Sequence, residues 1–186
     1  SVRVNIKTLA TVNAGPSKII CSSTGTVSLN GTIGGGTSTG IWTTNGTGPF
    51  VPGNTSLNNT YFITVGNAAM GTVTFSLSST NNGVCPAVVD TMLLFIDQVA
   101  TVNAGPNQAL CANTNTISLS GTVGGGSTTG IWASGGTGGF VPNNTALNPT
   151  YSITPADIAN GSVTFTLTST NNAACPAIRD TVRISI

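Results

Sequence analysis

The sequence predicts an all-β chain that consists of two tandem antiparallel β-sandwich domains. Shifting the 186-residue chain by 90 residues aligns it with itself without a gap, and 51 of the 87 residue pairs between 10–96 and 100–186 are identical. A period of this length matches one self-contained sandwich better than the thin unit of a solenoid. Thr, Val, Asn, Gly and Ser dominate the composition. These residues are poor helix formers, and they favour strands and turns.

The repeat also predicts the domain boundaries. Residues 7–96 should form the first sandwich and residues 97–186 the second. Residues 1–6 read Ser-Val-Arg-Val-Asn-Ile and resemble residues 181–186, which read Thr-Val-Arg-Ile-Ser-Ile. We therefore expect residues 1–6 to be the last strand of a preceding repeat, and the native protein to hold at least three copies.

Short alternating runs bounded by Gly, Asn and Pro predict the strands of the first copy. They lie at residues 26–30, 40–44, 59–65, 72–79 and 88–96, after a split first strand at 8–12 and 18–21. The glycine runs at 34–36 and 124–126 are expected to be turns, because no Gly-Lys-Ser/Thr follows that would make a phosphate loop. Thr154 and Pro155 are suited to opening one helical turn. The first copy has no Pro or Asp at the positions equivalent to Pro155 and Asp157, so we expect this turn to be optional.

Alternation also predicts which side chains point inward. In the last strand of the first copy, Leu93 and Phe95 should point outward, and they suggest contact with a neighbouring copy. Single exposed apolar residues are also common, so this contact is one of two readings. The expected core is Val27, Leu29, Trp42, Phe50, Leu57, Tyr61, Ile63, Val73, Phe75, Leu77, Met92, Leu94 and Ile96.

The composition argues against several classes of function. Charged residues make up 5% of the chain, His and Glu are absent, and the net charge is +1. A chain without a basic patch lacks the positive charge that nucleic-acid binding requires. General acid–base catalysis needs His or a carboxylate pair, and each copy holds only two Asp, so we expect no enzyme, cofactor or metal site. No apolar stretch approaches the ~20 residues of a membrane helix.

Each copy contains two cysteines, 64 residues apart, with no Cys-x-x-Cys motif. We expect the disulfides Cys21–Cys85 and Cys111–Cys175, one in each repeat, and hence an oxidising compartment. Chain-entropy models give roughly 4 kcal/mol for a loop of that length. The alternative is four free thiols. The order Cys, Trp, Cys is typical of immunoglobulin-like domains, although these cysteines lie near strand ends and not in mid-strand.

Several stretches resemble the repeats of giant Bacteroidetes surface adhesins. They are 103–108 with Cys111, 117–122, 130–132, 154–158, 162–168 and 175–178. The chain is most similar to SprB-type gliding-motility adhesins, with a looser likeness to PKD-type spacer domains. The resemblance covers nearly the whole chain. It implies type IX secretion, display at the outer membrane and movement along the cell during gliding, with no binding residues to carry over.

Two features could serve binding or modification. Asp90-Thr91-Met92 and Asp180-Thr181-Val182 resemble the Asp-Ser/Thr-apolar acceptor of Bacteroidetes O-glycosylation, which makes Thr91 and Thr181 candidate glycan sites. The aromatic residues Trp42, Trp132, Tyr61 and Tyr151 could stack on sugars. Their position inside strand runs favours core packing instead. The outward Thr, Ser and Asn rows could bind polysaccharide or form a plain solvent face.

The sequence therefore predicts a structural or adhesive repeat module of a large bacterial cell-surface adhesin that serves gliding motility and attachment. Its expected partners are neighbouring repeats of the same chain, extracellular polysaccharide or a solid substratum, and the gliding and secretion machinery of the outer membrane. The expected location is extracellular, at the cell surface. The alternative is a passive spacer or carbohydrate-binding module of a secreted multidomain hydrolase.

Overall fold

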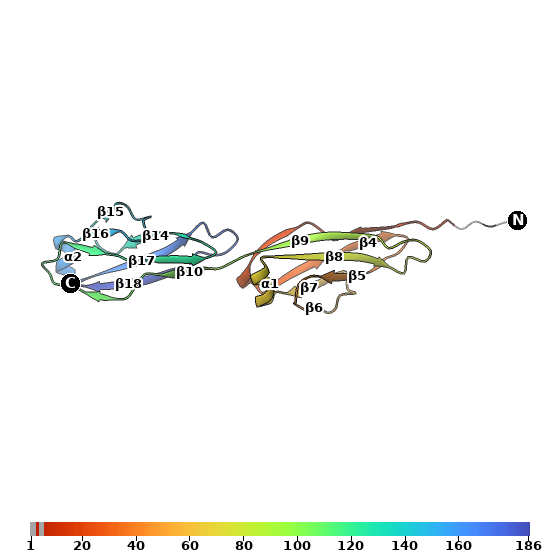
Figure 1. Cartoon of the computed structure of the whole chain (residues 1–186), viewed down its shortest axis with the longest axis horizontal. Helices are drawn as coiled ribbons and strands as arrows, with labels where there is room; N and C mark the ends of the chain where they lie inside the picture. The colour runs from red at the N-terminus through yellow and green to blue at the C-terminus, as the bar shows by residue number, and fades with distance from the viewer. Residues whose placement is uncertain (1–2, 4–5) are drawn as a thin grey trace. The chain divides into compact units, whose positions relative to one another are not determined.

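A computed structural model of the chain describes residue 3 and residues 6–186 (Figure 1). The chain divides into two compact units, Ser1–Asp97 and Gln98–Ile186. The expected strand of a preceding repeat at residues 1–6 falls mostly on residues outside the described ones, so it stays a prediction.

The first unit is built almost entirely from strands, as the Thr- and Val-rich alternating runs predict. Its elements are β1 (Ala10–Asn13), β2 (Lys18–Cys21), a 3-10 turn (Ser22–Thr24), β3 (Thr26–Asn30), β4 (Thr32–Gly35), β5 (Thr39–Thr44), β6 (Phe50–Val51), β7 (Asn58–Phe62), α1 (Val65–Met70), β8 (Thr72–Thr80) and β9 (Val89–Asp97). A four-stranded sheet has the order β2-β9-β8-β5, a three-stranded sheet has the order β3-β7-β6, and β1 pairs with β4.

The second unit repeats this order. Its elements are β10 (Ala100–Asn103), β11 (Gln108–Ala109), β12 (Thr116–Ser118), β13 (Thr122–Gly125), β14 (Thr129–Ser134), β15 (Phe140–Val141), β16 (Thr150–Ser152), α2 (Pro155–Asn160), β17 (Ser162–Thr170) and β18 (Arg179–Ser185). The sheets are β11-β18-β17-β14, β12-β16-β15 and β10-β13. The predicted class of two tandem β-sandwiches is confirmed.

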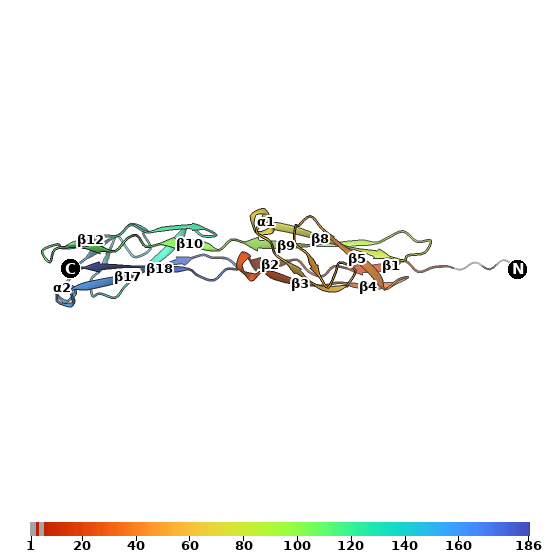
Figure 2. The same cartoon turned by 90° about the horizontal axis from the view of Figure 1, so that it is seen from below.

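The split first strand changes partner partway along. β1 pairs antiparallel with β4, whereas β2 runs parallel to β9. The chain turns between them at Gly15, whose φ of +86° suits glycine. The backbone N–H of Ala14 donates to the Asp90 carboxylate at 2.8 Å, which fixes this crossing to the start of β9. Figure 2 shows β2 and α1 at one end of the first unit and β1 and β4 at the other.

Each unit encloses its own core, and the predicted inward residues are confirmed. Trp42, Tyr61, Phe75 and Leu94 are fully buried, and Phe50, Leu57 and Ile63 pack against them. The three rings of Phe50, Tyr61 and Phe75 meet edge to face, with centroids 4.7–6.2 Å apart. The second unit has the same arrangement around Trp132, Tyr151 and Phe165.

Two local predictions were wrong. The stretch before the first glycine run forms β4, and it pairs Ile33 with Val12 of β1, so Gly34 and Gly35 lie in a strand. The helical turn is present in both copies and is not optional. In the first copy Thr64 caps α1, and Asn67 completes the capping box that Asp157 completes in the second. Asn supplies the same acceptor oxygen as Asp, so Pro155 and Asp157 are dispensable for this helix.

Candidate functional site

The candidate contact surface is the outer face of the four-stranded sheet in each repeat, which we call the hydroxyl face. Its members on β8 are Thr72, Thr74, Ser76, Ser78 and Thr80, and on β17 they are Ser162, Thr164, Thr166, Thr168 and Thr170. These side chains alternate with the buried core residues of the same strands. Their hydroxyl groups both donate and accept hydrogen bonds, and they carry no charge.

Strand register extends these rows across the sheet. Ser76 lies opposite Thr43 of β5 on one side and opposite Thr91 of β9 on the other. Residues directly opposite each other on neighbouring strands share a face. In the second repeat the corresponding row is Ala133, Thr166 and Thr181. The face therefore presents a ladder of short side chains, about 4.8 Å from strand to strand.

The two candidate glycan sites lie on this face. Thr91 and Thr181 are both exposed. The acidic residue before each threonine has a structural role of its own, because Asp90 accepts from the N–H of Ala14 and Asp180 accepts from the N–H of Ala104. The Asp-Thr-apolar pattern is thus explained by the fold, and glycosylation at these threonines stays a prediction.

The two repeats differ at the edge of the face formed by β2 and β9. In the first repeat Ile19 lies beside Phe95, and both are exposed together with Leu93. The equivalent residues of the second repeat are Ala109, Ser185 and Arg183. The outward orientation of Leu93 and Phe95 is confirmed, and contact with a neighbouring copy stays a prediction.

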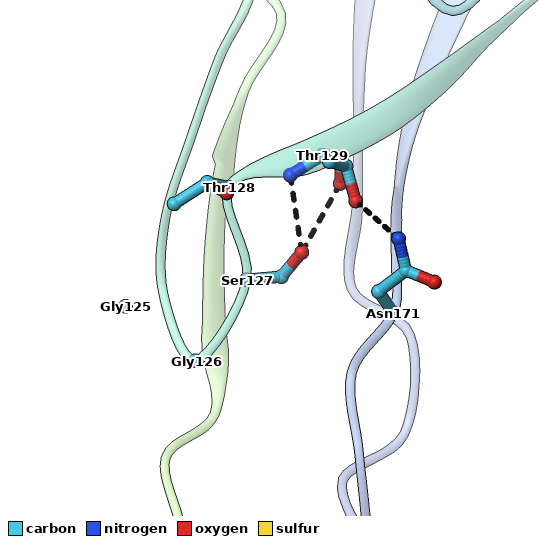
Figure 3. A pocket seen from close by; sticks show the side chains of 6 residues that line it. All are labelled: Gly125, Gly126, Ser127, Thr128, Thr129 and Asn171. Carbon is cyan, nitrogen blue, oxygen red and sulfur yellow. Dashed lines mark hydrogen bonds between the residues drawn. The ribbon is translucent and has the colours of Figure 1, made fainter.

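A small hollow of about 250 Å³ lies at one end of the face in the second repeat, lined by Gly125, Gly126, Ser127, Thr128, Thr129 and Asn171 (Figure 3). The amide of Asn171 donates to the Thr129 hydroxyl at 3.0 Å, and the Ser127 hydroxyl accepts from the Thr129 N–H at 3.2 Å. Ser127 also donates to the carbonyl oxygen of Thr170. The lining is polar and uncharged, so it suits a neutral hydroxylated ligand.

The first repeat contains the same polar cluster with one substitution. Thr37 stands in place of Ser127, and its hydroxyl donates to the carbonyl oxygen of Thr80 at 2.8 Å. Asn81 donates to the Thr39 hydroxyl at 3.0 Å, as Asn171 does to Thr129. Sequence reasoning missed this cluster because its residues are about 42 apart in each copy. The recurrence of the same Thr and Asn positions after 90 residues was its only signal.

The predicted disulfide pairing was wrong. Cys21 and Cys175 are disulfide-bonded, whereas Cys85 and Cys111 are free thiols, so neither predicted pair is formed. Cys21 lies in register with Asp97 at the end of β9, whereas Cys85 precedes the start of β9 and its sulfur lies 4.0 Å from the carbonyl oxygen of Lys7.

The length of β9 explains why the two cysteines of one repeat do not bond. Eight residue steps separate Val89 from Asp97, which is about 27 Å at ~3.3–3.4 Å per residue. Bridged cysteines have Cα atoms within about 7 Å of each other. The parallel pairing of β2 with β9 places Cys21 at the far end of this strand, and no local sequence pattern predicts that pairing. The two cysteines of one repeat, 64 residues apart, therefore lie at opposite ends of one sandwich.

One buried carboxylate has a perturbed pKa. Burial of Asp157 by itself raises its pKa. Backbone N–H groups of Thr137 and Thr154, with the hydroxyls of Thr154 and Tyr151, outweigh burial and hold the pKa below its usual 3.8. The hydrogen bonds from the Thr137 N–H and the Tyr151 hydroxyl are 2.9 and 3.1 Å long. This network ties the loop before β15 to α2, and its full burial gives it a structural role.

The other candidate ligand groups lie in the core. Trp42, Trp132, Tyr61 and Tyr151 are at most 1% exposed, so they pack in the sandwich and offer no stacking surface to a sugar. Among the described residues, no three His, Cys, Asp or Glu side chains lie close enough to hold a metal ion. In the part of the chain that the structure describes, no helix is long and apolar enough to cross a membrane.

The parallel β2–β9 pairing, the two facing sheets and the buried tryptophan define the class of fold: each unit is an immunoglobulin-like β-sandwich, and the chain is a tandem of two.

Solved structures of the same class match nearly the whole chain. Sidekick-1 immunoglobulin domains 1–5 match 97% of it at 11% identity with a TM-score of 0.59, and an I-band fragment of titin matches 97% at 14% identity with a TM-score of 0.57. A fragment of Drosophila N-cadherin matches 96% at 9% identity with a TM-score of 0.52. The chain spans 39%, 66% and 49% of these three structures, respectively.

These identities are low, so the likeness concerns the fold alone. No family model and no curated protein sequence matches the chain.

Proposed function

We propose that this chain is a stalk-and-contact segment of a large bacterial cell-surface adhesin of the SprB type, which serves gliding motility and attachment outside the cell. The observation that carries the proposal is the hydroxyl face, which recurs after 90 residues on a separate self-contained core. The disulfide supports an oxidising, extracellular location. Type IX secretion and partners in the outer membrane follow from the sequence resemblance to such adhesins.

Repetition suits a surface that makes weak contacts. A row of Thr and Ser hydroxyls offers hydrogen bonds that compete with water, so one repeat should bind a hydroxylated polymer or glass only weakly. Several repeats on one chain raise the effective concentration of the next contact and give avidity without stronger individual contacts. In the second repeat Arg179 and Arg183 lie opposite Thr168 and Thr164 on this face, so any salt dependence of binding should arise there.

Adhesion can be tested with beads that carry the 186-residue chain on glass and on polysaccharide films. We expect beads to be retained at both 0.05 and 0.5 M NaCl, because most groups on the face are uncharged hydroxyls. Thr43→Asp combined with Ala133→Asp places one charge on the face of each repeat, and it should reduce retention. Both residues are exposed.

The matched control is Ser28→Asp combined with Ser118→Asp, which adds the same charges on exposed positions of β3 and β12. This control should retain beads as the unmodified chain does. Equal losses in both variants would assign the effect to net charge alone. Unmodified chains that retain no beads on any of these surfaces would disprove the contact role and leave that of a stalk.

One observation favours the alternative of a carbohydrate-binding or spacer module in a secreted hydrolase. The hollow around Ser127, Thr129 and Asn171 is polar and neutral. If it is a sugar site, titration with soluble oligosaccharides should shift the amide NMR signals of Thr129 and Asn171. Asn171→Ala should abolish those shifts, and a catalytic domain should flank these repeats in the full gene.

A further inference from the structure

Asparagine followed by glycine is a dipeptide whose side-chain amide is easily lost, because glycine has no Cβ atom to keep its backbone nitrogen away from the amide carbon. The reaction needs a glycine N–H that can give up its proton and a backbone that can rearrange. The hydrogen bonds of the glycines therefore show which asparagines can react. The chain contains this dipeptide four times, at Asn30-Gly31, Asn45-Gly46, Asn82-Gly83 and Asn160-Gly161.

Three of these glycines have their N–H in a hydrogen bond. The bonds run from Gly31 to the carbonyl oxygen of Leu57 at 2.9 Å, from Gly46 to the hydroxyl of Thr44 at 3.0 Å, and from Gly161 to the carbonyl oxygen of Ile158 at 3.0 Å. Each bond keeps the proton on the nitrogen and holds the backbone in place. The asparagines before these glycines should therefore keep their amides in the folded chain.

Gly83 differs from the other three. It is exposed in the loop between β8 and β9, and its N–H forms no hydrogen bond with any of the described residues. A Cβ atom on Gly83 would meet nothing within 4 Å, so the loop has room to rearrange. The amide of Asn82 donates to the carbonyl oxygen of Ser79 at 3.0 Å, whereas its Oδ1 atom has no hydrogen-bond partner within the described part of the chain.

We propose that Asn82 is a site of spontaneous deamidation. Hydroxide takes the proton from the backbone nitrogen of Gly83, and this nitrogen attacks Cγ of Asn82. The new C–N bond closes a cyclic succinimide, the bond from Cγ to Nδ2 breaks, and Nδ2 leaves as ammonia with a proton from water. A water molecule then opens the ring and leaves aspartate or isoaspartate at this position. No oxidant or reductant takes part.

Deamidation removes the hydrogen bond that ties this loop to the end of β8. An aspartate carboxylate is ionised at neutral pH and cannot donate, so it would repel the carbonyl oxygen of the buried Ser79. Isoaspartate also lengthens the backbone inside the turn in which the Cys85 N–H donates to the carbonyl oxygen of Asn82. Residues 81–88 should therefore loosen as the protein ages. This inference does not depend on whether the hydroxyl face binds any surface.

The second repeat provides an internal comparison. Asn172 occupies the equivalent position, and its amide donates to the carbonyl oxygen of Ser169 at 3.1 Å, as the Asn82 amide does to its own partner. The next residue is Ala173, with a φ of +51°. The alanine methyl group hinders the approach of the backbone nitrogen. Asn172 should therefore keep its amide under conditions in which Asn82 loses it.

Incubation of the folded 186-residue chain at mildly alkaline pH, followed by peptide mapping with mass spectrometry, tests the proposal. We expect Asn82 to deamidate, and Asn30, Asn45 and Asn160 to stay intact over the same time. In guanidinium chloride the hydrogen bonds of the fold are lost, so all four asparagines should deamidate at similar rates. A folded chain in which Asn82 reacts no faster than the other three would overturn the proposal.

Two variants exchange glycine and alanine between the equivalent positions. Gly83→Ala should leave Asn82 intact, and Ala173→Gly should make Asn172 deamidate. Both positions have a positive φ and already hold either glycine or alanine, so neither change should unfold its repeat, and circular dichroism checks this. Deamidation of Asn82 at an unchanged rate in Gly83→Ala would overturn the proposed attack by the glycine nitrogen.

Discussion

The pair Asn67 and Asp157 shows how one residue gives two otherwise similar repeats different chemistry. Both side chains are fully buried, and both complete the capping box of the helix beside them. Asp157 accepts from the N–H of Thr137 at 2.9 Å. The Nδ2 atom of Asn67 has no hydrogen-bond partner among the described residues. Exchanging the oxygen and nitrogen of the Asn67 amide would place its N–H groups against the N–H of Thr64. In neither orientation can all the hydrogen-bonding groups of Asn67 find partners.

This difference predicts a pH-dependent stability in the second repeat alone. The pKa of Asp157 is lowered in the folded state, so its stabilising effect is complete above the unfolded pKa of about 4 and is lost as the pH falls through the folded pKa. Asp157→Asn should remove this dependence and cost about 1–3 kcal/mol at pH 7. Asn67→Asp should stabilise the first repeat at pH 7 and introduce the dependence there.

Hydrogen-exchange mass spectrometry of peptides from β8 and β17 would measure each repeat separately in the intact chain. Asp90 and Asp180 accept the same hydrogen bond in the two repeats, so they do not distinguish the repeats. Identical acid profiles for β8 and β17 in the unmodified chain would contradict this interpretation of Asp157.

The threonines after those aspartates carry a separate prediction. If Thr91 and Thr181 are O-glycosylated, protein purified from its natural source should have an intact mass above that of the bare sequence, and glycopeptides should map to both sites. Thr91→Ala with Thr181→Ala should restore the bare mass. Both side chains are exposed at the middle of the hydroxyl face, so their glycans would cover it. An intact mass equal to the sequence mass would refute the modification.

At the scale of elements, the connection between β12 and β13, which lie in different sheets, depends on a residue with no side chain. A Cβ atom at Gly121 would lie 2.7 Å from Cδ2 of Leu167 and 2.7 Å from Cζ2 of Trp132, both in the core. Gly121→Ala should therefore destabilise the second repeat by about 1–3 kcal/mol through overpacking. Gly139→Ala is the control, because a Cβ atom there meets nothing within 4 Å.

Chemical denaturation followed by Trp132 fluorescence, in a chain whose other tryptophan is replaced (Trp42→Phe), would compare the two variants. We expect a lower denaturant midpoint for Gly121→Ala and a nearly unchanged midpoint for Gly139→Ala. Equal midpoints would show that the core around Trp132 tolerates an extra methyl group.

The elements also show which features of the fold could be predicted from the sequence. Alternation placed β3 and β8 to within one residue and predicted the inward Met92 and Leu94, because a half-buried strand has a period of two. It could not reveal that β2 is parallel to β9, because pairing direction depends on a distant partner. The cysteine error followed from that, since only the parallel pairing places Cys21 at the far end of β9. The hollow at Ser127 was missed for the same reason: Asn171 joins it from a different strand connection.

For the whole molecule, the near absence of charge sets the solution behaviour. A chain with five basic and four acidic residues and a net charge of +1 has little electrostatic repulsion between copies. We expect its solubility and its thermal midpoint to change little with NaCl near neutral pH. Light scattering and calorimetry over 0.05–0.5 M salt would check this, and a strong salt dependence would indicate a charged patch that the sequence does not show.

The parallel pairing of β2 with β9 has a mechanical consequence within the first unit. When this unit is pulled from its two ends, the N-terminal end of β2 and the C-terminal end of β9 are drawn apart along the strands. The backbone hydrogen bonds between the two strands are then loaded together in shear and do not break one after another.

Four residues of β2 pair with β9 in the first unit, and two residues of β11 pair with β18 in the second. In optical tweezers the first repeat should therefore unfold at the higher force. Two repeats that unfold at the same force would contradict this. A strand clamped in parallel beside the exit strand makes each repeat resist drag before its core opens.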